Sequence, residues 1–203
     1  MTEMLDILHN DPLLVKLKNE GLSLGTPMLQ EEGLVFIAGK AKTDKALRIL
    51  EIGTAIGYSA ISLHVLTGSE VWSIERDRSA YDIATKNVEN ARLTQNIHLI
   101  FGDALTIDIS DLATFDIIFI DAAKAQYQKF FERFAPHLSH NGVIITDNLS
   151  FHGIVDSPLD HWTHNQMSIA KKIKGFVTWL QNNQEFQTEF HAVGDGMSVS
   201  RRR

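Results

Sequence analysis

Two short apolar runs constrain the fold of this chain more than any other feature. They read IIFID, from Ile117 to Asp121, and VIITD, from Val143 to Asp147. Apolar residues stand at successive positions in them rather than at alternate ones, which is typical of strands buried on both faces of a parallel sheet. Such a sheet needs helices on both sides to cover it. The runs therefore predict an α/β fold with a doubly wound sheet.

The rest of the chain alternates between strand-like and helix-like segments. Strands are expected at residues 47–52, 71–75, 97–101, 115–121 and 143–147, with a closing pair at 190–193 and 197–200. Helices are expected at residues 58–66, 78–92, 127–137 and 165–182. Gly194-Asp195-Gly196 is a hairpin signal between the closing strands. We expect a Rossmann-like sheet of seven strands, mostly parallel with a C-terminal antiparallel hairpin strand and helices on both faces. It would form a single domain, in which helices of residues 1–42 pack on a core of residues 43–203.

The composition excludes several classes of protein. The chain has 203 residues and no cysteine, so its stability depends neither on disulfides nor on a thiolate zinc site. A net charge of −6 argues against a protein that coats nucleic acid through bulk charge. No apolar stretch approaches the roughly 20 residues that span a bilayer. We expect a soluble, cytoplasmic protein with no membrane contact.

Two short basic clusters depart from the acidic average. One comprises Lys171, Lys172 and Lys174 in a late helix, and the other is the C-terminal run of Arg201, Arg202 and Arg203. Short charge runs are usually a solvated helix face or a solubilising tail. The alternative is that these side chains contact phosphates of a nucleic acid.

The predicted strand ends carry the candidate chemistry. In an open sheet of this kind, ligands bind beyond the carboxyl ends of the strands. These ends are Glu51-Ile52-Gly53, Glu75, Gly102-Asp103, Asp121 and Asp147-Asn148. Acids or glycine at five strand ends in register indicate a ligand site along this edge.

The glycine loop after the first strand indicates which ligand to expect. Gly53 and Gly57 are four residues apart, a spacing that does not fit the G-x-G-x-x-G fingerprint of dinucleotide binding. Glu51 is unfavourable beside a phosphate but suits an ammonium group, and Glu75 can accept both hydroxyls of a ribose. A ligand with a ribose, a positive charge and no phosphate is S-adenosylmethionine. Tight packing after a strand is the simpler explanation of the loop alone.

Five motifs occur in order along the chain: ILEIGTAIGYSA, SIERD, GDA, DIIFIDAAKAQY and GVIITDN. Together they resemble the metal-dependent O-methyltransferases of the catechol and caffeoyl-CoA type. FIDAAKAQYQKFF and the ending VGDGMSVSRRR are also similar to the bacterial tRNA 5-hydroxyuridine methyltransferases, which share a basic C-terminal tail. The resemblance implies S-adenosylmethionine and Mg²⁺ as cofactors and a homodimer as the usual assembly.

The chemistry of two strand ends agrees with a metal site. Asp121, Asp147 and Asn148 offer three oxygen ligands of the hard type that Mg²⁺ prefers. A turn after a strand is the alternative explanation of Asp147-Asn148. The resemblance implies that Lys124 is the general base and that Asp121 takes part in catalysis. A lysine at a helix start can also be an ordinary surface residue.

The resemblance also assigns cofactor contacts residue by residue. Glu75 would hold the ribose, Asp103 and Ala104 the adenine, and Gly53 and Ser59 the methionine end. The remaining assigned contacts are Glu51, Asp121, which would serve both metal and cofactor, and Leu29, which aligns with a methionine that contacts the cofactor through its backbone.

Three functions remain open from the sequence. The first is methylation of the 5-hydroxyl of 5-hydroxyuridine in a tRNA anticodon loop, for which the two basic clusters could bind phosphates. The second is methylation of a small catechol, for which Phe151 and Trp162 could form an apolar gate. The third, a non-catalytic binding protein, is disfavoured by the intact set of metal and base residues. The histidines His152, His161 and His164 could contact RNA, although most histidines of this kind are surface residues.

Overall fold

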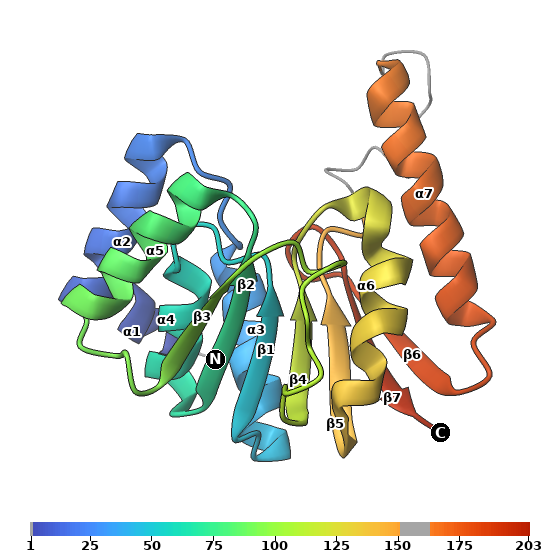
Figure 1. Ribbon diagram of the computed structural model, residues 1–203, viewed down its shortest axis with the longest axis horizontal. Coiled ribbons are helices and arrows are strands. Elements are labelled where there is room, and N and C mark those ends of the chain that lie inside the picture. Colours follow the sequence, from blue (N-terminus) through green and yellow to red (C-terminus); the bar gives the residue numbers. More distant parts are fainter. Residues whose placement is uncertain (1, 151–162) are drawn as a thin grey trace.

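The computed structural model describes residues 2–150 and 163–203, and it has a twisted sheet between two layers of helices (Figure 1). The sheet has seven strands in the order β3-β2-β1-β4-β5-β7-β6. Their bounds are Arg48–Ile52 (β1), Glu70–Glu75 (β2), Ile97–Phe101 (β3), Phe115–Ile120 (β4), Leu138–Thr146 (β5), Phe186–His191 (β6) and Met197–Arg202 (β7).

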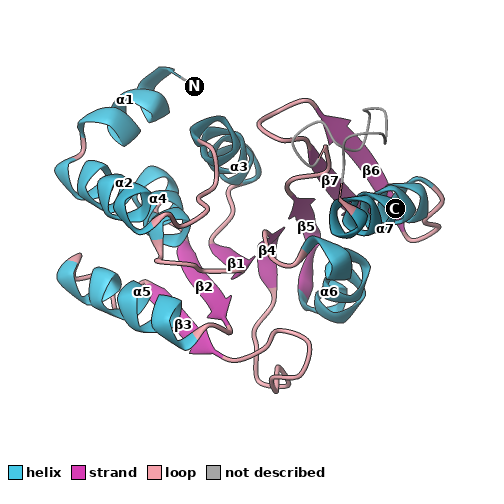
Figure 2. Ribbon diagram, turned by 90° about the horizontal axis from the view of Figure 1, so that it is seen from above, coloured by secondary structure: helices cyan, strands magenta, loops and turns pink. Residues whose placement is uncertain are grey.

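The helices follow the expected alternation with the strands. Their bounds are Thr2–Asn10 (α1), Pro12–Leu24 (α2), Glu31–Asp44 (α3), Tyr58–Thr67 (α4), Arg78–Asn90 (α5), Tyr127–Phe134 (α6) and His164–Gln181 (α7), with short 3-10 helices at Lys124–Gln126 (η1) and Ala135–His137 (η2). Figure 2 shows α3, α4 and α5 on one face of the sheet and α6 and α7 on the other. None of the described helices is long and apolar enough to cross a bilayer.

The pairing confirms the predicted fold class. Strands β1 to β5 pair in parallel, whereas β7 runs antiparallel to both β5 and β6. The hairpin boundaries were predicted wrongly. The strand expected at 190–193 is Phe186–His191, because residues 192–196 form the turn, and the strand expected to end at residue 200 continues to Arg202.

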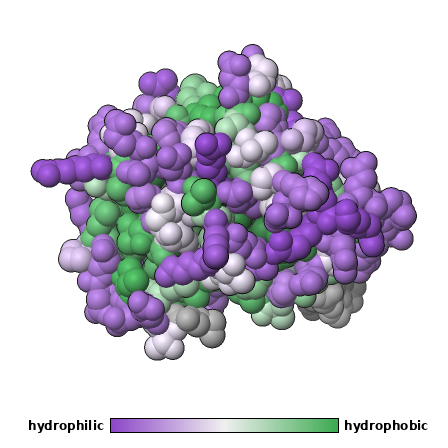
Figure 3. All heavy atoms as spheres, turned by 90° about the horizontal axis from the view of Figure 1, so that it is seen from below, coloured by the Kyte–Doolittle hydropathy of each residue, from purple (hydrophilic) through white to green (hydrophobic). Residues whose placement is uncertain are grey.

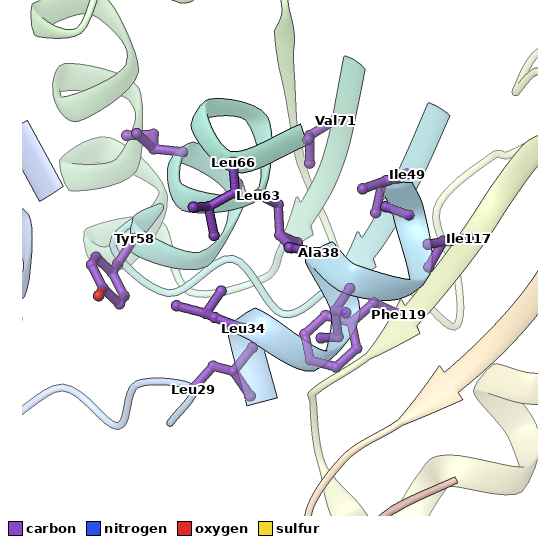
Figure 4. Close-up of a cluster of buried hydrophobic side chains, with 14 of the residues drawn as sticks. Leu29, Leu34, Ala38, Ile49, Tyr58, Leu63, Leu66, Val71, Ile117 and Phe119 are labelled. Carbon is purple, nitrogen blue, oxygen red and sulfur yellow. The ribbon is translucent and has the colours of Figure 1, made fainter. Parts of the chain in front are cut away.

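The apolar central strands are buried on both faces, as IIFID and VIITD predict. In β4, Ile117 and Phe119 face the cluster formed with α1 to α4, and part of this cluster is drawn in Figure 4. Ile118 and Ile120 face the opposite cluster, which includes the aromatic residues of α6 and α7. Each of these four side chains is fully buried. Burial of a side chain of this size stabilises a fold by about 1.5–3 kcal/mol, so the centre of the sheet is a rigid support for its carboxyl edge.

One crossover of the sheet has no helix. Residues 102–114 connect β3 to β4, passing β2 and β1, as turns and irregular structure. Figure 2 shows this connection as a loop beside β4. It begins at the carboxyl edge, where the candidate site lies. The opposite edge is shown in Figure 3, in which hydrophilic residues cover much of the surface between scattered apolar patches.

Candidate active site

A cavity of about 330 Å³ lies at the carboxyl ends of the parallel strands. It is lined by segments that follow β1, β2, β3, β4 and β5, and by residues 27–29 before α3. Of the residues expected to bind a cofactor or a metal, those that line it are Leu29, Gly53, Ser59, Glu75, Asp103, Ala104, Asp121, Lys124 and Asn148. One cavity therefore brings together most of the residues that the sequence singles out.

The glycine after β1 is required by a close approach of two backbones. Gly53 has φ +103°, and a Cβ atom there would overlap the main-chain oxygen of Asp121. The amide of Asp121 in turn donates to the carbonyl of Ile52 at 3.0 Å. A side chain at position 53 would push the ends of β1 and β4 apart, so the glycine allows both ends to face one cavity.

At one end of the cavity, backbone amides hold the carboxylates in place. Glu75 accepts hydrogen bonds from the amides of Ala55 at 2.9 Å and Asp77 at 2.8 Å. Asp103 accepts one from the amide of Leu105 at 2.8 Å. Both acids are thus fixed without a ligand and keep lone pairs for hydroxyl or amino groups. We call this part, with Gly102 and Ala104, the nucleoside end.

Glu51 does not reach the cavity, contrary to the direct contact expected from its place two residues before Gly53. It lies on the α4 face of β1, because side chains alternate along a strand, and it has no exposed surface. Its carboxyl accepts a hydrogen bond from Ser73, which also pairs with Thr54 at 2.6 Å. Burial raises the pKa of Glu51 to about 8. Glu51 is therefore protonated near neutral pH, and through Ser73 it is connected to Thr54 of the glycine loop.

At the other end, a network of hydrogen bonds joins Asp121, Lys124, Asp147 and Asn148. The side-chain amide of Asn148 donates to Asp147 at 2.7 Å and lies 3.5 Å from Oδ1 of Asp121. The ammonium of Lys124 donates to Oδ1 of Asn148 at 2.6 Å. The structure thus brings the three expected metal ligands and the expected base together. We call this part the metal end.

The carboxylates of the metal end are electrostatically unfavourable as they stand. Burial, and then the neighbouring Asp121, raise the pKa of Asp147 to about 7, and burial raises the pKa of Asp121 as well. Oδ1 of Asp147 has no hydrogen-bond partner within residues 2–150 and 163–203. Burial lowers the pKa of Lys124. A cation between the two acids would lower the pKa of both carboxyl groups and give Oδ1 of Asp147 a partner.

The donor set fits a hard divalent cation with one adjustment. No three His, Cys, Asp or Glu side chains of the described chain form a cluster, so beside the two acids the amide of Asn148 is the further side-chain donor expected from the sequence. Its nitrogen now faces the two carboxylates, and its oxygen faces Lys124. Binding through that oxygen would require the amide to turn over.

Two residues of the metal end were not expected from the sequence. The Tyr127 hydroxyl is buried without a partner in the described part of the chain, and burial and nearby acids raise its pKa well above the usual range. Asp195, in the turn between β6 and β7, lies within electrostatic reach of Lys124, Tyr127 and Asp147. The turn docks behind the site, because the amide of Leu149 donates to the Gly196 carbonyl at 2.9 Å. The motif Gly194-Asp195-Gly196 could have indicated that this turn lies near the site, but a hairpin turn was already a sufficient explanation of the motif.

Comparison with known proteins identifies the family. Residues 15–203 match the sequence profile of a family described as O-methyltransferase. The chain belongs to the O-methyltransferase family. It is 28% identical to a caffeoyl-CoA O-methyltransferase of Populus kitakamiensis over 91% of this chain and 82% of that protein.

Solved structures agree with this assignment. A Staphylococcus aureus structure assigned to the caffeoyl-CoA O-methyltransferases has a TM-score of 0.90 and 30% identity, covering 100% of this chain and 98% of the other. An O-methyltransferase of Bacillus cereus, solved with S-adenosylhomocysteine, has a TM-score of 0.82 and 24% identity, covering 100% and 98%. The latter likeness shows that the fold is shared.

The two basic clusters of this O-methyltransferase differ in their surroundings. Lys171, Lys172 and Lys174 are exposed on α7, and no carboxylate of the described residues pairs with them. Of the C-terminal arginines, expected either as a solubilising tail or as phosphate contacts, Arg201 and Arg202 contact other parts of the protein. Arg201 pairs with Asp44 at 2.5 Å, and Arg202 donates to the carbonyl of Ala135 at 2.6 Å. The C-terminus also lies at the amino ends of the parallel strands, away from the cavity (Figure 1).

Several residues expected to contact the acceptor fall outside the described part of the chain. These are Phe151, His152, His161 and Trp162. His164 is described and lies exposed at the start of α7.

Proposed function

We propose that the protein transfers a methyl group from S-adenosylmethionine to the 5-hydroxyl of 5-hydroxyuridine in a tRNA anticodon loop, giving 5-methoxyuridine. One observation carries the proposal. A single cavity has amide-held carboxylates at one end and Asp121, Lys124 and Asn148 at the other, with Asp147 buried directly behind Asn148. Methyl transfer from a nucleoside cofactor to an acceptor hydroxyl needs a cofactor site and an acceptor site side by side.

The nucleoside end would hold the cofactor. Glu75 would accept the ribose hydroxyls, Asp103 and Ala104 would contact the adenine, and Gly53 and Ser59 the methionine end. The carboxylates fit this role because backbone amides already fix them. Structural neighbours from Podospora anserina and Streptomyces achromogenes were solved with S-adenosylhomocysteine and S-adenosylmethionine, which supports the same cofactor here.

The metal end would hold Mg²⁺ through Asp121, Asp147 and Asn148. When bound, the ion supplies Lewis acidity, which makes a coordinated hydroxyl more acidic. Asp121 and Asp147 would hold the ion in position, and the raised pKa values of these two acids favour a cation there. The absence of cysteine from the chain excludes thiolate ligands and agrees with a hard ion.

Lys124 would take the proton from the acceptor hydroxyl. Its pKa is lowered by burial, so its neutral form is more accessible than that of a solvated lysine. Lys124 lines the cavity beside Asp121 and Asn148, where its nitrogen would face the acceptor oxygen. The walls of the cavity would align that oxygen with the methyl group and exclude water, and positioning of this kind supplies much of the rate.

A tRNA acceptor fits the metal end as well as a catechol does, and the lysines of α7 favour it. The 5-hydroxyl and 4-carbonyl of 5-hydroxyuridine form the same chelating pair that a catechol offers. The exposed lysines of α7 lie on the helix that begins above the carboxyl edge of the sheet (Figure 1), and surface cations of this kind suit phosphate binding. We further expect a cytoplasmic homodimer, as the family resemblance implies.

A small catechol or phenolic acceptor is the second candidate. The names of the plant relatives, such as the Populus kitakamiensis enzyme, favour it. The net charge of −6 also gives RNA no general attraction to the protein.

The decisive assay uses the purified protein, S-adenosylmethionine and Mg²⁺ with either tRNA that carries 5-hydroxyuridine or a free catechol. We expect conversion of 5-hydroxyuridine to 5-methoxyuridine, seen by nucleoside mass spectrometry, with a higher kcat/KM than for the catechol. A strain that lacks the gene should accumulate 5-hydroxyuridine in its tRNA. Turnover of the catechol alone would establish the second candidate instead.

A further inference from the structure

The crossover loop of residues 102–114 carries the part of the nucleoside end that would meet the adenine, yet it has little structure of its own. Its first residue is anchored to β2, because the amide of Gly102 donates to the carbonyl of Glu75 at 2.9 Å. Beyond Gly102 its backbone hydrogen bonds are local, such as those from the amide of Ile107 to the carbonyl of Asp103 at 2.8 Å and from Leu112 to Ile109 at 3.0 Å. This crossover has no helix. Beyond Gly102 it is held by its own apolar side chains, which pack on the core, and by polar side chains from elsewhere.

Two such side chains come from the end of α6 and the 3-10 helix that follows it. The Arg133 guanidinium donates through Nη2 to the carbonyl of Ile107, and Nδ1 of His137 lies 3.3 Å from the carbonyl of Leu112. The Arg133 side chain is partly buried, its Nε atom is enclosed, and its guanidinium lies 6.0 Å from the ring centre of Phe134. Arg133 is therefore committed to the loop rather than to solvent.

The bond to Ile107 reaches the cavity through one tight contact. A Cβ atom on Gly102 would lie 2.9 Å from Cδ1 of Ile107, so the Ile107 side chain packs directly against the backbone of Gly102. Gly102 and the next two residues line the cavity. A shift of Ile107 would consequently move the backbone that faces the adenine.

The same helix contacts the cavity directly. Phe130 is buried and lines the cavity, and Arg133 follows it by three residues, a spacing that places both on one side of a helix. We infer that Arg133, although it does not line the cavity, is a positioning residue that holds the adenine-binding loop through the carbonyl of Ile107. This inference rests on the proposed function, because it takes the ligand of the nucleoside end to be an adenine nucleoside.

The test measures binding of two ligands by calorimetry to the full-length parent and to Arg133→Met. The ligands are S-adenosylmethionine and 5′-methylthioadenosine, which has the nucleoside but lacks the amino acid. We expect about tenfold weaker binding of both ligands, since the variant removes a hydrogen bond from a charged donor. With S-adenosylmethionine at saturation, kcat should equal that of the parent, because Lys124 and the metal end are untouched.

Lys129→Met is the matched control, because it removes an exposed cation from the same helix. Its affinities should stay within about twofold of the parent. Arg133→Lys retains a cationic donor and should recover part of the affinity, and it carries the test alone if Arg133→Met does not fold.

Three outcomes would overturn the inference. They are unchanged affinity in both Arg133 variants, an equal loss in Lys129→Met, and a loss confined to S-adenosylmethionine, which would point to the methionine end. A parent protein that binds neither ligand contradicts the proposed function itself, and the inference with it.

Discussion

Both ends of the cavity have carboxylates at strand ends, but the surroundings of these carboxylates are opposite. At the nucleoside end, both oxygens of Glu75 and one of Asp103 accept hydrogen bonds from backbone amides. At the metal end, Asp147 is buried beside Asp121, its pKa is raised to about 7, and one of its oxygens has no partner in the described chain. The first end has its hydrogen bonds in place before a ligand arrives, whereas at the second end burial makes the charged form of both acids unfavourable.

Because of this difference, we expect the nucleoside end to determine cofactor affinity and the metal end to determine the rate of methyl transfer. Preformed hydrogen-bond partners favour tight binding, because little order is lost when the ligand arrives. At the metal end, unfavourable charge would be relieved by the proposed cation, and under the proposed mechanism the rate would be gained there. Changes at the two ends should therefore affect different measurements.

The largest expected effect is at the metal end. Asp147→Ala should lower methyl transfer by about four orders of magnitude, because the variant removes both the cation site and the orientation of the acceptor. Binding of S-adenosylmethionine should change by less than about threefold. Steady-state kinetics and calorimetry measure the two, with Asp111→Ala, an exposed acid of the crossover loop, as the control.

EDTA should reproduce the loss of activity in the parent, and Mg²⁺ should reverse it. Full turnover in EDTA would remove the metal from the mechanism and with it the contrast between the ends.

Glu51 provides a test, at a position without a proposed metal, of whether burial makes the charged form of a carboxylate unfavourable. Its pKa in the folded protein, about 8, lies above its ordinary value of 4.5. The stability this group contributes is fully present below pH 4.5 and is lost as the pH rises through 8. Between pH 5 and pH 9, the free energy of unfolding should therefore fall by about 4 kcal/mol less in Glu51→Gln than in the parent.

Urea unfolding at both pH values measures this difference, and Glu70→Gln, at an exposed position, is the control. Parallel curves for Glu51→Gln and the parent would mean that a carboxylate is readily charged at this depth. The argument for a cation beside Asp147 would then lose its physical basis.

A smaller effect is expected at the nucleoside end. Glu75→Gln keeps an acceptor oxygen but removes the charge and one amide bond, so S-adenosylmethionine should bind about 10- to 100-fold more weakly. The kcat at saturating cofactor should be close to that of the parent. Glu89→Gln, an exposed change on α5, controls for a general effect of removing a charge. A fall in kcat with unchanged affinity would mean that the division between the two ends is wrong.

The smallest effects concern the surface outside the cavity. Replacing Lys171, Lys172 and Lys174 by glutamine should lower the slope of log affinity for tRNA against log salt by about one unit for each phosphate that a lysine no longer neutralises. Catechol kinetics should be unchanged. Arg201→Ala should lower the free energy of unfolding, because it breaks the ion pair with Asp44, and should leave the tRNA salt slope unchanged. The reverse pattern would restore the C-terminal arginines as the RNA-binding group.

The sequence predicts the centre of the molecule better than its periphery. IIFID and VIITD identify the central strands because burial on both faces leaves few polar positions, and the acids that follow them identify the site. The limits of the last hairpin could not be predicted, because Phe186 to His191 mixes polar and apolar residues at an edge with one neighbour. Local pattern is a weak guide where pairing rather than burial determines a strand.

The candidate site shows the same limit. Strand ends predict which residues approach one another, so Asp121, Lys124, Asp147 and Asn148 could be grouped in advance. Side-chain direction is harder to infer: Glu51 precedes the glycine loop but faces α4. Contacts across the fold, such as the one between Arg133 and Ile107, leave no spacing signal, because they join segments brought together only by the sheet.

The order of strands also decides when the site can exist during folding. Ile52 of β1 pairs with Ile120 of β4, so Gly53 meets Asp121 only after the long segment between them is organised. The metal end waits longer, because Thr146 of β5 lies opposite Ser198 of β7, near the end of the chain. Closing such distant contacts is slow, since the entropy of long loops opposes them. A chain emerging from the ribosome should therefore acquire its nucleoside end first, and its capacity for methyl transfer only once the last strand has been synthesised.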